Sequence, residues 1–237
     1  MEIRPASLIS GATDAVGTTV IIDVFRAFTT AAVALSRGAR RIVMVDSLDE
    51  ALATRNKGIG DYCIGERDSI KPPGFDFGNS PAELACAEVA GKTLIQTTTN
   101  GTAGINAARG ADVIYAGAFV TAEATVRTIL RKQPVAVTLV AIGRSNGRVR
   151  ADEDELCALY LRSRLGGRQP NIPALQALLA TMPPPPSPHL VSVGAYDMKD
   201  REVAGQVDKM GFAIAVRRQG ELLIAEAEGD PKSAAAL

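Results

Sequence analysis

The stretch TTVIIDVFRAFTTAAVALSRGARRIVMV, residues 18–45, decides the fold class of this chain. It opens with a short apolar and β-branched run at 18–23, which predicts a buried strand. The alanine-rich segment 26–37 predicts a helix that ends at Gly38, and residues 41–45 predict a second strand. A strand followed by a helix and another strand is typical of α/β proteins with a mostly parallel sheet.

The same alternation continues along the chain. Further helices are predicted at 48–55, from Ser80 to about Gly91, at 121–131 and at 152–165. Further strands are predicted at 93–97, 112–115 and 135–142, with a hairpin formed by 212–216 and 221–225. We therefore expect a layered α/β/α fold with a mostly parallel or mixed sheet.

The length fits one generous domain over residues 1–237. This domain could be divided into two lobes, 1–130 and 131–228, with the active site between them. The proline-rich run PPPPSP at 183–188 predicts a stiff extended linker, and residues 229–237 predict a flexible tail.

Composition excludes several classes of function. Hydrophobic residues make up 46% of the chain, aromatic residues only 4%, and tryptophan is absent. The core must therefore be built from Ala, Val, Leu and Ile, which suits a buried parallel sheet. The 26 basic and 26 acidic residues balance, so there is no electrostatic case for a nucleic-acid partner or an anionic membrane.

The sequence also bears on location. The start of the chain has no long apolar run, and no window approaches the roughly 18 apolar residues of a membrane-spanning helix. Cys63, Cys86 and Cys157 are odd in number and widely spaced, which favours free thiols of a cytosolic protein over disulfides. We expect a cytoplasmic protein without a membrane partner, and a homodimer is compatible with the sequence.

The first polar cluster is DVFRAFTT at 23–30, where a carboxylate closes a strand and an arginine opens the next helix. Open α/β sheets bind ligands at the carboxyl ends of their strands. Asp23 could hold a hard cation there, and Arg26 could bind an oxyanion through two N–H groups. The alternative is that Asp23 caps the helix and Arg26 is a solvated residue of its first turn.

The second cluster is TTTNGT at 97–102. A strand that ends in hydroxyls and leads through Asn100 and Gly101 into a helix offers backbone N–H groups to an anion. Gly101 would let the backbone approach a ligand closely. The alternative is an ordinary strand-to-helix turn capped by threonine. No GxxxxGK[ST] pattern is present, so a nucleoside-triphosphate loop is not indicated.

The third cluster is GRSNGRVRADEDELCA at 143–158, after the longest apolar strand. Asp152 and Glu155 have the spacing of a capping box, and the helix dipole stabilises acidic residues in a first turn. That explanation does not require Glu153 or Asp154, either of which could be a metal ligand.

The long polar loop 65–81 adds Glu66, Arg67 and Asp68 and closes with GNSP. Such a loop is often a binding loop, although an exposed surface loop has the same composition.

Several phosphoryl-transfer mechanisms are excluded by the residues that are missing. The chain has one histidine, His189, which excludes a histidine nucleophile and a histidine-rich dinuclear metal site. No cysteine is followed by arginine six residues later, and Phe25 stands where a phosphoaspartate mechanism needs a second aspartate. The remaining carboxylates, arginines, hydroxyls and glycines favour magnesium over transition metals.

These clusters, in this order, resemble the family of magnesium-dependent 2-phosphosulfolactate phosphatases of coenzyme M biosynthesis. The matching motifs are DVFRAFTT at 23–30, GER at 65–67, GNSP at 78–81, TTNGT at 98–102 and EDELCA at 153–158. Each motif is short, but five of them in register are hard to obtain by chance. The resemblance extends from about residue 15 to about residue 225.

The resemblance implies hydrolysis of a phosphate monoester, namely 2-phosphosulfolactate, to sulfolactate and phosphate with Mg²⁺ as cofactor. The implied catalytic residues are Asp23, Arg26, Glu66, Arg67 and Glu153. The implied metal ligands are Asp23, Glu153 and Asp154. The implied substrate-binding residues are Asn79, Ser80, Thr99, Asn100, Gly101, Thr102 and Arg144.

Two alternatives stay open at this point. The substrate could be another small phosphorylated hydroxy acid, or the chain could be a non-catalytic anion-binding module on the same fold. The chain also departs from the pattern at Phe28, where the resemblance leads us to expect a small hydroxyl residue. That phenylalanine could reshape one wall of the pocket.

Overall fold

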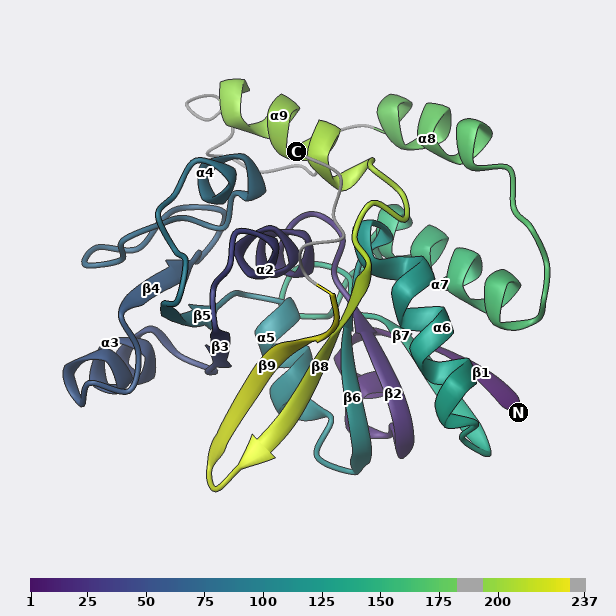
Figure 1. The fold of residues 1–237 in the computed structure, drawn as a ribbon, viewed down its shortest axis with the longest axis horizontal. Helices are drawn as coiled ribbons and strands as arrows, with labels where there is room; N and C mark the ends of the chain where they lie inside the picture. Colours follow the sequence, from purple (N-terminus) through teal and green to yellow (C-terminus); the bar gives the residue numbers. More distant parts are fainter. Residues whose placement is uncertain (183–193, 231–237) are drawn as a thin grey trace.

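A nine-stranded mixed sheet forms the centre of the computed structural model, which describes residues 1–182 and 194–230 (Figure 1). The strands are β1 (Glu2–Ser7), β2 (Gly17–Ile22), β3 (Arg41–Met44), β4 (Tyr62–Gly65), β5 (Thr93–Thr97), β6 (Ala111–Gly117), β7 (Ala136–Ala141), β8 (Phe212–Gln219) and β9 (Leu222–Gly229). Their order across the sheet is β1-β7-β2-β6-β8-β9-β3-β5-β4.

The sheet consists of two parallel groups joined by a hairpin. Strands β1, β7, β2 and β6 are parallel to one another, as are β3, β5 and β4. The hairpin β8–β9 lies between the groups in antiparallel pairing with β6 and β3. By these pairings the two parallel groups run in opposite directions across the hairpin. The loop after β5 nevertheless reaches the loop after β2, because Gly101 lies against Asp23.

Helices cover both faces of this sheet. They are α1 (Leu8–Thr13), α2 (Ala27–Ser36), α3 (Leu48–Asn56), α4 (Pro81–Ala85), α5 (Gly101–Ala107), the short 3₁₀ helix η1 (Phe119–Thr121), α6 (Ala122–Lys132), α7 (Asp152–Leu165), α8 (Ile172–Thr181) and α9 (Gly194–Ala204). Helices α1, α2, α4 and α5 share one hydrophobic cluster with the sheet, and α6, α7 and α8 share another on the opposite face. The predicted α/β/α layering is confirmed.

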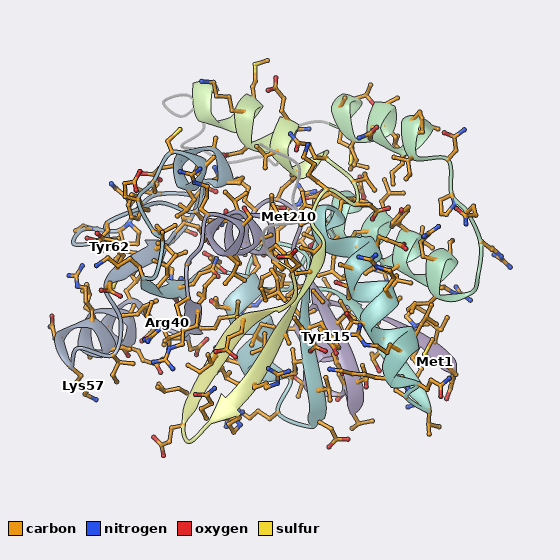
Figure 2. The ribbon with its side chains drawn as sticks, in the orientation of Figure 1. Met1, Arg40, Lys57, Tyr62, Tyr115 and Met210 are labelled. Carbon is orange, nitrogen blue, oxygen red and sulfur yellow. The ribbon has the colours of Figure 1, made fainter. Side chains whose placement is uncertain are left out.

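Alternation along β2 shows how one strand serves both clusters. Ile21 packs with the α2 side, whereas Val20 and Ile22 pack with the α6 and α7 side, and all three are fully buried. A strand covered on both faces reads as a continuous apolar run, which is why it could be predicted. Among the side chains labelled in Figure 2, Met210 belongs to the first cluster and lies beside α2, and Tyr115 belongs to the second and lies lower among the strands.

Helix α2 is the most enclosed helix near the site. Every residue from Ala27 to Leu35 is buried, because the helix packs against the sheet on one side and against α4 on another. Its alanines allow this close approach, which larger side chains would prevent. Figure 1 shows α2 near the middle of the molecule, with α4 and α9 above it.

Most predicted elements are confirmed, and α7 has the predicted bounds. The helix predicted from Ser80 to about Gly91 is wrong, because α4 ends at Ala85. Leu84 and Val89 are both fully buried, and an α-helix would direct residues five apart to different sides. The chain therefore leaves the helix to bury both side chains.

Strands β1 and β4 and helices α1, α8 and α9 were not predicted. Strand β1 has little apolar character and contains Pro5, which an edge strand tolerates. The predicted hairpin is confirmed, and β9 continues to Gly229, one residue into the predicted tail. The linker predicted at 183–188 and the rest of that tail from 231 onward lie outside the described residues.

The sheet crosses the boundary between the two predicted lobes. Strands β7, β8 and β9 pair with strands that precede residue 130. Within the part of the chain that the structure describes, no helix combines the length and the hydropathy that a membrane crossing would need.

Candidate active site

The loops after β2, β5 and β7 meet at one end of the molecule. A Cβ atom built on Gly101, at the start of α5, would stand 2.9 Å from Oδ2 of Asp23. Oδ1 of Asn100 accepts hydrogen bonds from the backbone N–H groups of Asn146 (2.9 Å) and Gly147 (3.3 Å). The three loops predicted to carry the chemistry are therefore in contact, although they are far apart in the sequence.

Asp23 is a buried carboxyl group with one open oxygen. Its Oδ1 accepts the backbone N–H of Ala27 at 3.0 Å, and no donor among the described residues reaches its Oδ2. Burial raises the pKa of Asp23 to about 7, with further increases from Glu66 and Glu153, against the opposing effects of the Ala27 N–H and Arg26. Asp23 therefore binds the first N–H of α2 and still has a free oxygen. The interpretation as a capping residue and the interpretation as a cation ligand are compatible.

Asp154 joins the ends of two neighbouring strands. Its Oδ1 accepts the N–H of Val24 at 2.8 Å, and its Oδ2 accepts the N–H of Gly143 at 3.0 Å. Burial, followed by the charges of Asp23 and Glu153, raises its pKa well above the usual value. Because both oxygens already bind backbone N–H groups, Asp154 holds the loops after β2 and β7 in register.

Glu153 is the second buried carboxylate that could take a ligand. It is 6% exposed, and its Oε2 lies 3.5 Å from Nη2 of Arg144. Burial raises its pKa, whereas the nearby charges of Arg144 and Arg201 lower it. The carboxylate also accepts the backbone N–H of Glu153 itself, and its two oxygens have room for a further ligand.

Glu66 joins the loops after β4 and β5. Its Oε1 accepts the N–H of Thr99 at 2.7 Å, and its Oε2 accepts the N–H of Ser69 at 2.8 Å and the Thr99 hydroxyl at 3.1 Å. The side chain is 7% exposed, and every oxygen is engaged. Glu66 therefore contributes charge beside Asp23 and fixes the position of Thr99.

Arg67 is engaged within the protein. Its Nη1 donates to the carbonyl of Glu66 at 2.8 Å, and its Nη2 donates to the carbonyl of Asp46 at 2.8 Å and to the Thr97 hydroxyl at 2.7 Å. These bonds connect the ends of β3, β4 and β5. The arginine predicted as a phosphate ligand thus serves first to hold three loops together.

Arg26 pairs with an aspartate that the sequence did not indicate. Its Nη1 donates to Oδ2 of Asp200 at 2.6 Å, and Asp200 is fully buried. Oδ1 of Asp200 accepts the Ser80 hydroxyl at 2.6 Å and the N–H of Ala82 at 3.0 Å. Ser80 also caps α4 by accepting the N–H of Glu83, so its hydroxyl is fully engaged.

The other predicted substrate ligands near these loops, and Phe28 beside them, differ in their contacts. Thr102 accepts the N–H of Thr98 at 2.7 Å and donates to its carbonyl at 3.0 Å, so this hydroxyl stabilises the turn itself. Asn79 is 7% exposed, and its buried Oδ1 has no donor among the described residues. Phe28 is fully buried, and its ring lies against the start of α5 beside Gly101.

Both residues that the sequence reasoning missed lie on α9. Asp200 binds Arg26, and Arg201 lies over the ring of Phe25, with its Cζ 5.1 Å from the ring centroid. Arg201 also donates to the carbonyl of Met182, while its Nη1 is buried without an acceptor among the described residues. The adjacent charged residues Asp200 and Arg201 were the only sign of these functional residues in the sequence, and α9 itself was not predicted.

The acidic side chains at these strand ends bear on whether the site suits a magnesium ion. Among the residues that the structure describes, no three His, Cys, Asp or Glu side chains are grouped closely enough to form a complete metal site. Magnesium, however, is usually held by one or two carboxylates, with water and substrate phosphate completing its shell. Oδ2 of Asp23 and the carboxylate of Glu153 fit that requirement, because both supply hard oxygen ligands.

The fold and the site together define a layered α/β protein that gathers buried carboxylates and arginines at its strand ends, as a site for an anionic substrate requires. A family model described as 2-phosphosulpholactate phosphatase matches residues 5–181. The chain belongs to this family.

Individual relatives agree with this assignment. A protein of Thermotoga petrophila named probable 2-phosphosulfolactate phosphatase is 40% identical over 148 residues, which are 62% of this chain and 62% of that protein. Proteins with the same name from Thermoplasma acidophilum (34% over 153 residues, 65% of this chain and 67% of that protein) and Deinococcus radiodurans (38% over 135 residues, 56% of each) are also similar. The chain thus spans less than two thirds of the length of the Thermotoga relative.

Proposed function

We propose that this chain hydrolyses the phosphate monoester 2-phosphosulfolactate at the site around Asp23, with Mg²⁺ as cofactor. The observation that carries the proposal is that Asp23 is buried with one open carboxylate oxygen, close enough to Arg26, Glu66 and Glu153 for their charges to act on it. The names of the relatives support the choice of substrate.

A bound Mg²⁺ would be held by Oδ2 of Asp23 and the carboxylate of Glu153, and it would neutralise charge on the phosphoryl oxygens. Burial and neighbouring acids raise the pKa values of both groups, so their ionised forms lack compensating charge when no cation is present. Asp154 was predicted as a third ligand. We assign it instead to holding the backbone, because both of its oxygens accept N–H groups.

Arg26 would bind the oxygens of the transferring phosphoryl group. Among the described residues its side chain makes one hydrogen bond, to Asp200, which leaves its other N–H groups open. Charge in phosphoryl transfer is spread over several oxygens, so a fixed guanidinium beside them supplies much of the stabilisation.

Activation of the attacking water falls to the same two carboxylates, Asp23 and Glu153. The other buried acids near them, Glu66 and Asp154, use both oxygens for hydrogen bonds within the protein. A carboxylate within hydrogen-bond reach of the attacking water can accept its proton.

The sulfonate of the substrate would bind Arg144 and Arg201. Nε of Arg144 and Nη1 of Arg201 are buried without an acceptor among the described residues. A buried donor without an acceptor costs free energy, which a bound anion would recover. Both arginines also act electrostatically on Glu153, so they belong to the same site.

The proposal includes a cytoplasmic role in coenzyme M biosynthesis, as the family resemblance implies. It is tested by measuring phosphate release from 2-phosphosulfolactate and from a panel of phosphorylated hydroxy acids without a sulfonate. Preference for the sulfonate supports the proposal. Turnover of another panel member alone would show that the chain is a phosphatase for a different ester. A folded protein that binds phosphate without turnover would favour an anion-binding module.

A further inference from the structure

We propose that Asp200 is a positioning residue that fixes the Arg26 guanidinium for catalysis; this inference rests on the proposed function. Asp200 lies on α9, 174 positions from Arg26 in the sequence, and their side chains meet at 2.6 Å. The aspartate side chain is fully buried, and that of Arg26 is 14% exposed. The pair therefore forms at the edge of the site, with only its arginine reaching solvent.

The surroundings of Asp200 give its carboxylate one orientation. Oδ1 receives the Ser80 hydroxyl and the Ala82 N–H, so it is directed at the start of α4. Oδ2 receives Nη1 of Arg26 and no other described donor. With one oxygen fixed by α4, the position of the other is fixed as well, and it specifies where the guanidinium must lie.

A free arginine has several rotatable bonds and loses side-chain entropy when it binds an anion. Arg26 avoids most of this loss because Nη1 is already held. Its other N–H groups make no hydrogen bond to a described residue, and its charge acts on Asp23. A guanidinium is planar, so fixing one nitrogen limits the positions of the others. Displacement of such a group by about 1 Å can reduce turnover about 10²-fold.

A purely structural role for Asp200 is the competing explanation, since the residue also connects α9 to α4. The two explanations differ in one respect. A positioning role acts through Arg26 and disappears when Arg26 is replaced, whereas a structural role affects activity equally with or without the arginine.

The test is a double-mutant cycle with Asp200→Asn and Arg26→Met, measured as kcat/KM and Tm. The amide oxygen of asparagine can still accept hydrogen bonds from the Ser80 hydroxyl and the Ala82 N–H. Its NH₂ group, in place of Oδ2, cannot accept from the arginine. We expect Asp200→Asn to lower kcat/KM about 10²-fold in the wild-type background. In the Arg26→Met background the same substitution should lower kcat/KM less than about threefold. Equal losses in both backgrounds would overturn the proposal, as would an unchanged kcat/KM in Asp200→Asn.

Asp208→Asn is the matched control. Asp208 accepts the N–H of Glu123 at 2.8 Å and the Tyr160 hydroxyl, so it also connects elements, but not through Arg26. This variant should lower Tm while leaving kcat/KM near wild type. Should Asp200→Asn fail to fold, Asp200→Glu supplies the cycle, because its longer side chain keeps the charge and displaces the arginine.

Binding of inorganic phosphate, measured by calorimetry on the same variants, separates this inference from the proposed function. If the wild-type protein hydrolyses none of the esters, the proposed function fails, and the cycle is then judged on the phosphate Kd. The positioning role is supported if Asp200→Asn weakens phosphate binding in the wild-type background but does not weaken it further in the Arg26→Met background. Equal weakening in both backgrounds, or none, contradicts it.

Discussion

Oδ2 of Asp23 lies so close to the backbone of Gly101 that a Cβ atom at Gly101 would stand 2.9 Å from it. The same Cβ atom would stand 2.6 Å from Cβ of Ala27 and 3.2 Å from the ring of Phe28. The start of α5 thus rests directly on the loop after β2. This contact brings the TTNGT and DVFRAFTT motifs into one site, and only glycine leaves room for it.

Gly101→Ala should therefore damage both stability and activity. The methyl group would push α5 away from Asp23, and overpacking of this kind costs about 1–3 kcal/mol. We expect a lower Tm and a reduced kcat/KM. Gly166→Ala is the control, because its Cβ atom would stand 3.3 Å from the Arg162 carbonyl oxygen, a far smaller overlap, at the end of α7. Wild-type activity in Gly101→Ala would show that the close approach is not needed.

Replacement of Asp23 should change the pH dependence of stability. The pKa of this group rises from 3.8 to about 7 on folding, so between those values the folded protein holds a proton that the unfolded chain has lost. The stability that the group contributes is complete below about pH 4 and is lost as pH rises through about 7. Asp23→Asn removes this loss and keeps an acceptor for the Ala27 N–H.

We expect Asp23→Asn to be more stable than wild type above pH 7 by on the order of 2–4 kcal/mol, with the difference vanishing near pH 4. The measurement is the free energy of unfolding in denaturant across this range. Asp61→Asn is an informative contrast, because the hydrogen bond from the Thr93 N–H lowers the pKa of Asp61 and its stabilising effect should grow as pH rises. A variant of Asp23 less stable than wild type at high pH would contradict the assignment.

Arg67→Ala should act mainly on stability. Its guanidinium donates to Asp46, Glu66 and Thr97, and loss of such charge-assisted bonds costs about 1.5–3 kcal/mol. We expect a clear fall in Tm, with a loss of kcat/KM that is smaller than that of Arg26→Met. An unchanged Tm together with a large loss of kcat/KM would instead place the guanidinium on the substrate.

Arg201→Met should separate substrates by their second anionic group. If Arg201 binds the sulfonate, its loss raises KM for 2-phosphosulfolactate about 10–100-fold, the equivalent of one charge-assisted contact. KM for p-nitrophenyl phosphate, which has no second anion, should hardly change. Arg218→Met on β8 serves as the control for removing a surface arginine. Equal effects on both substrates would exclude Arg201 as the sulfonate ligand.

The fold was largely predictable because its strands are buried on both faces and therefore stand out as apolar runs. Strand β2 is the clearest example, since Val20, Ile21 and Ile22 are all needed in the core. Strand β1 was not predictable in this way, because an edge strand with Pro5 has no such run. Helix α4 was predicted too long, because the need to bury Val89 is a tertiary effect without a local signal.

The site was predictable in its residue types but not in their hydrogen bonds. The sequence indicated Asp23, Glu66, Glu153 and Asp154, and the structure brings them into electrostatic contact. Which oxygens are open depends on backbone N–H groups that come from other loops, such as that of Gly143. A sequence pattern contains no information on such long-range contacts.

Asp200 is a site residue that the sequence did not indicate at all. It follows the proline-rich run, in a helix that was not predicted, and its partner Arg26 lies near the start of the chain. The family resemblance implied Ser80 as a substrate ligand. Its hydroxyl instead binds Asp200, a role that only the tertiary structure reveals.

The central claim is that Asp23 and Glu153 hold a magnesium ion used to hydrolyse 2-phosphosulfolactate. The most direct test is phosphate release from this ester by wild-type protein and by Asp23→Asn, each with Mg²⁺ and then with EDTA. We predict turnover only for the wild type with Mg²⁺, and none for the folded Asp23→Asn variant in either condition. Turnover by wild type that persists in EDTA, or full activity in Asp23→Asn, would contradict the claim.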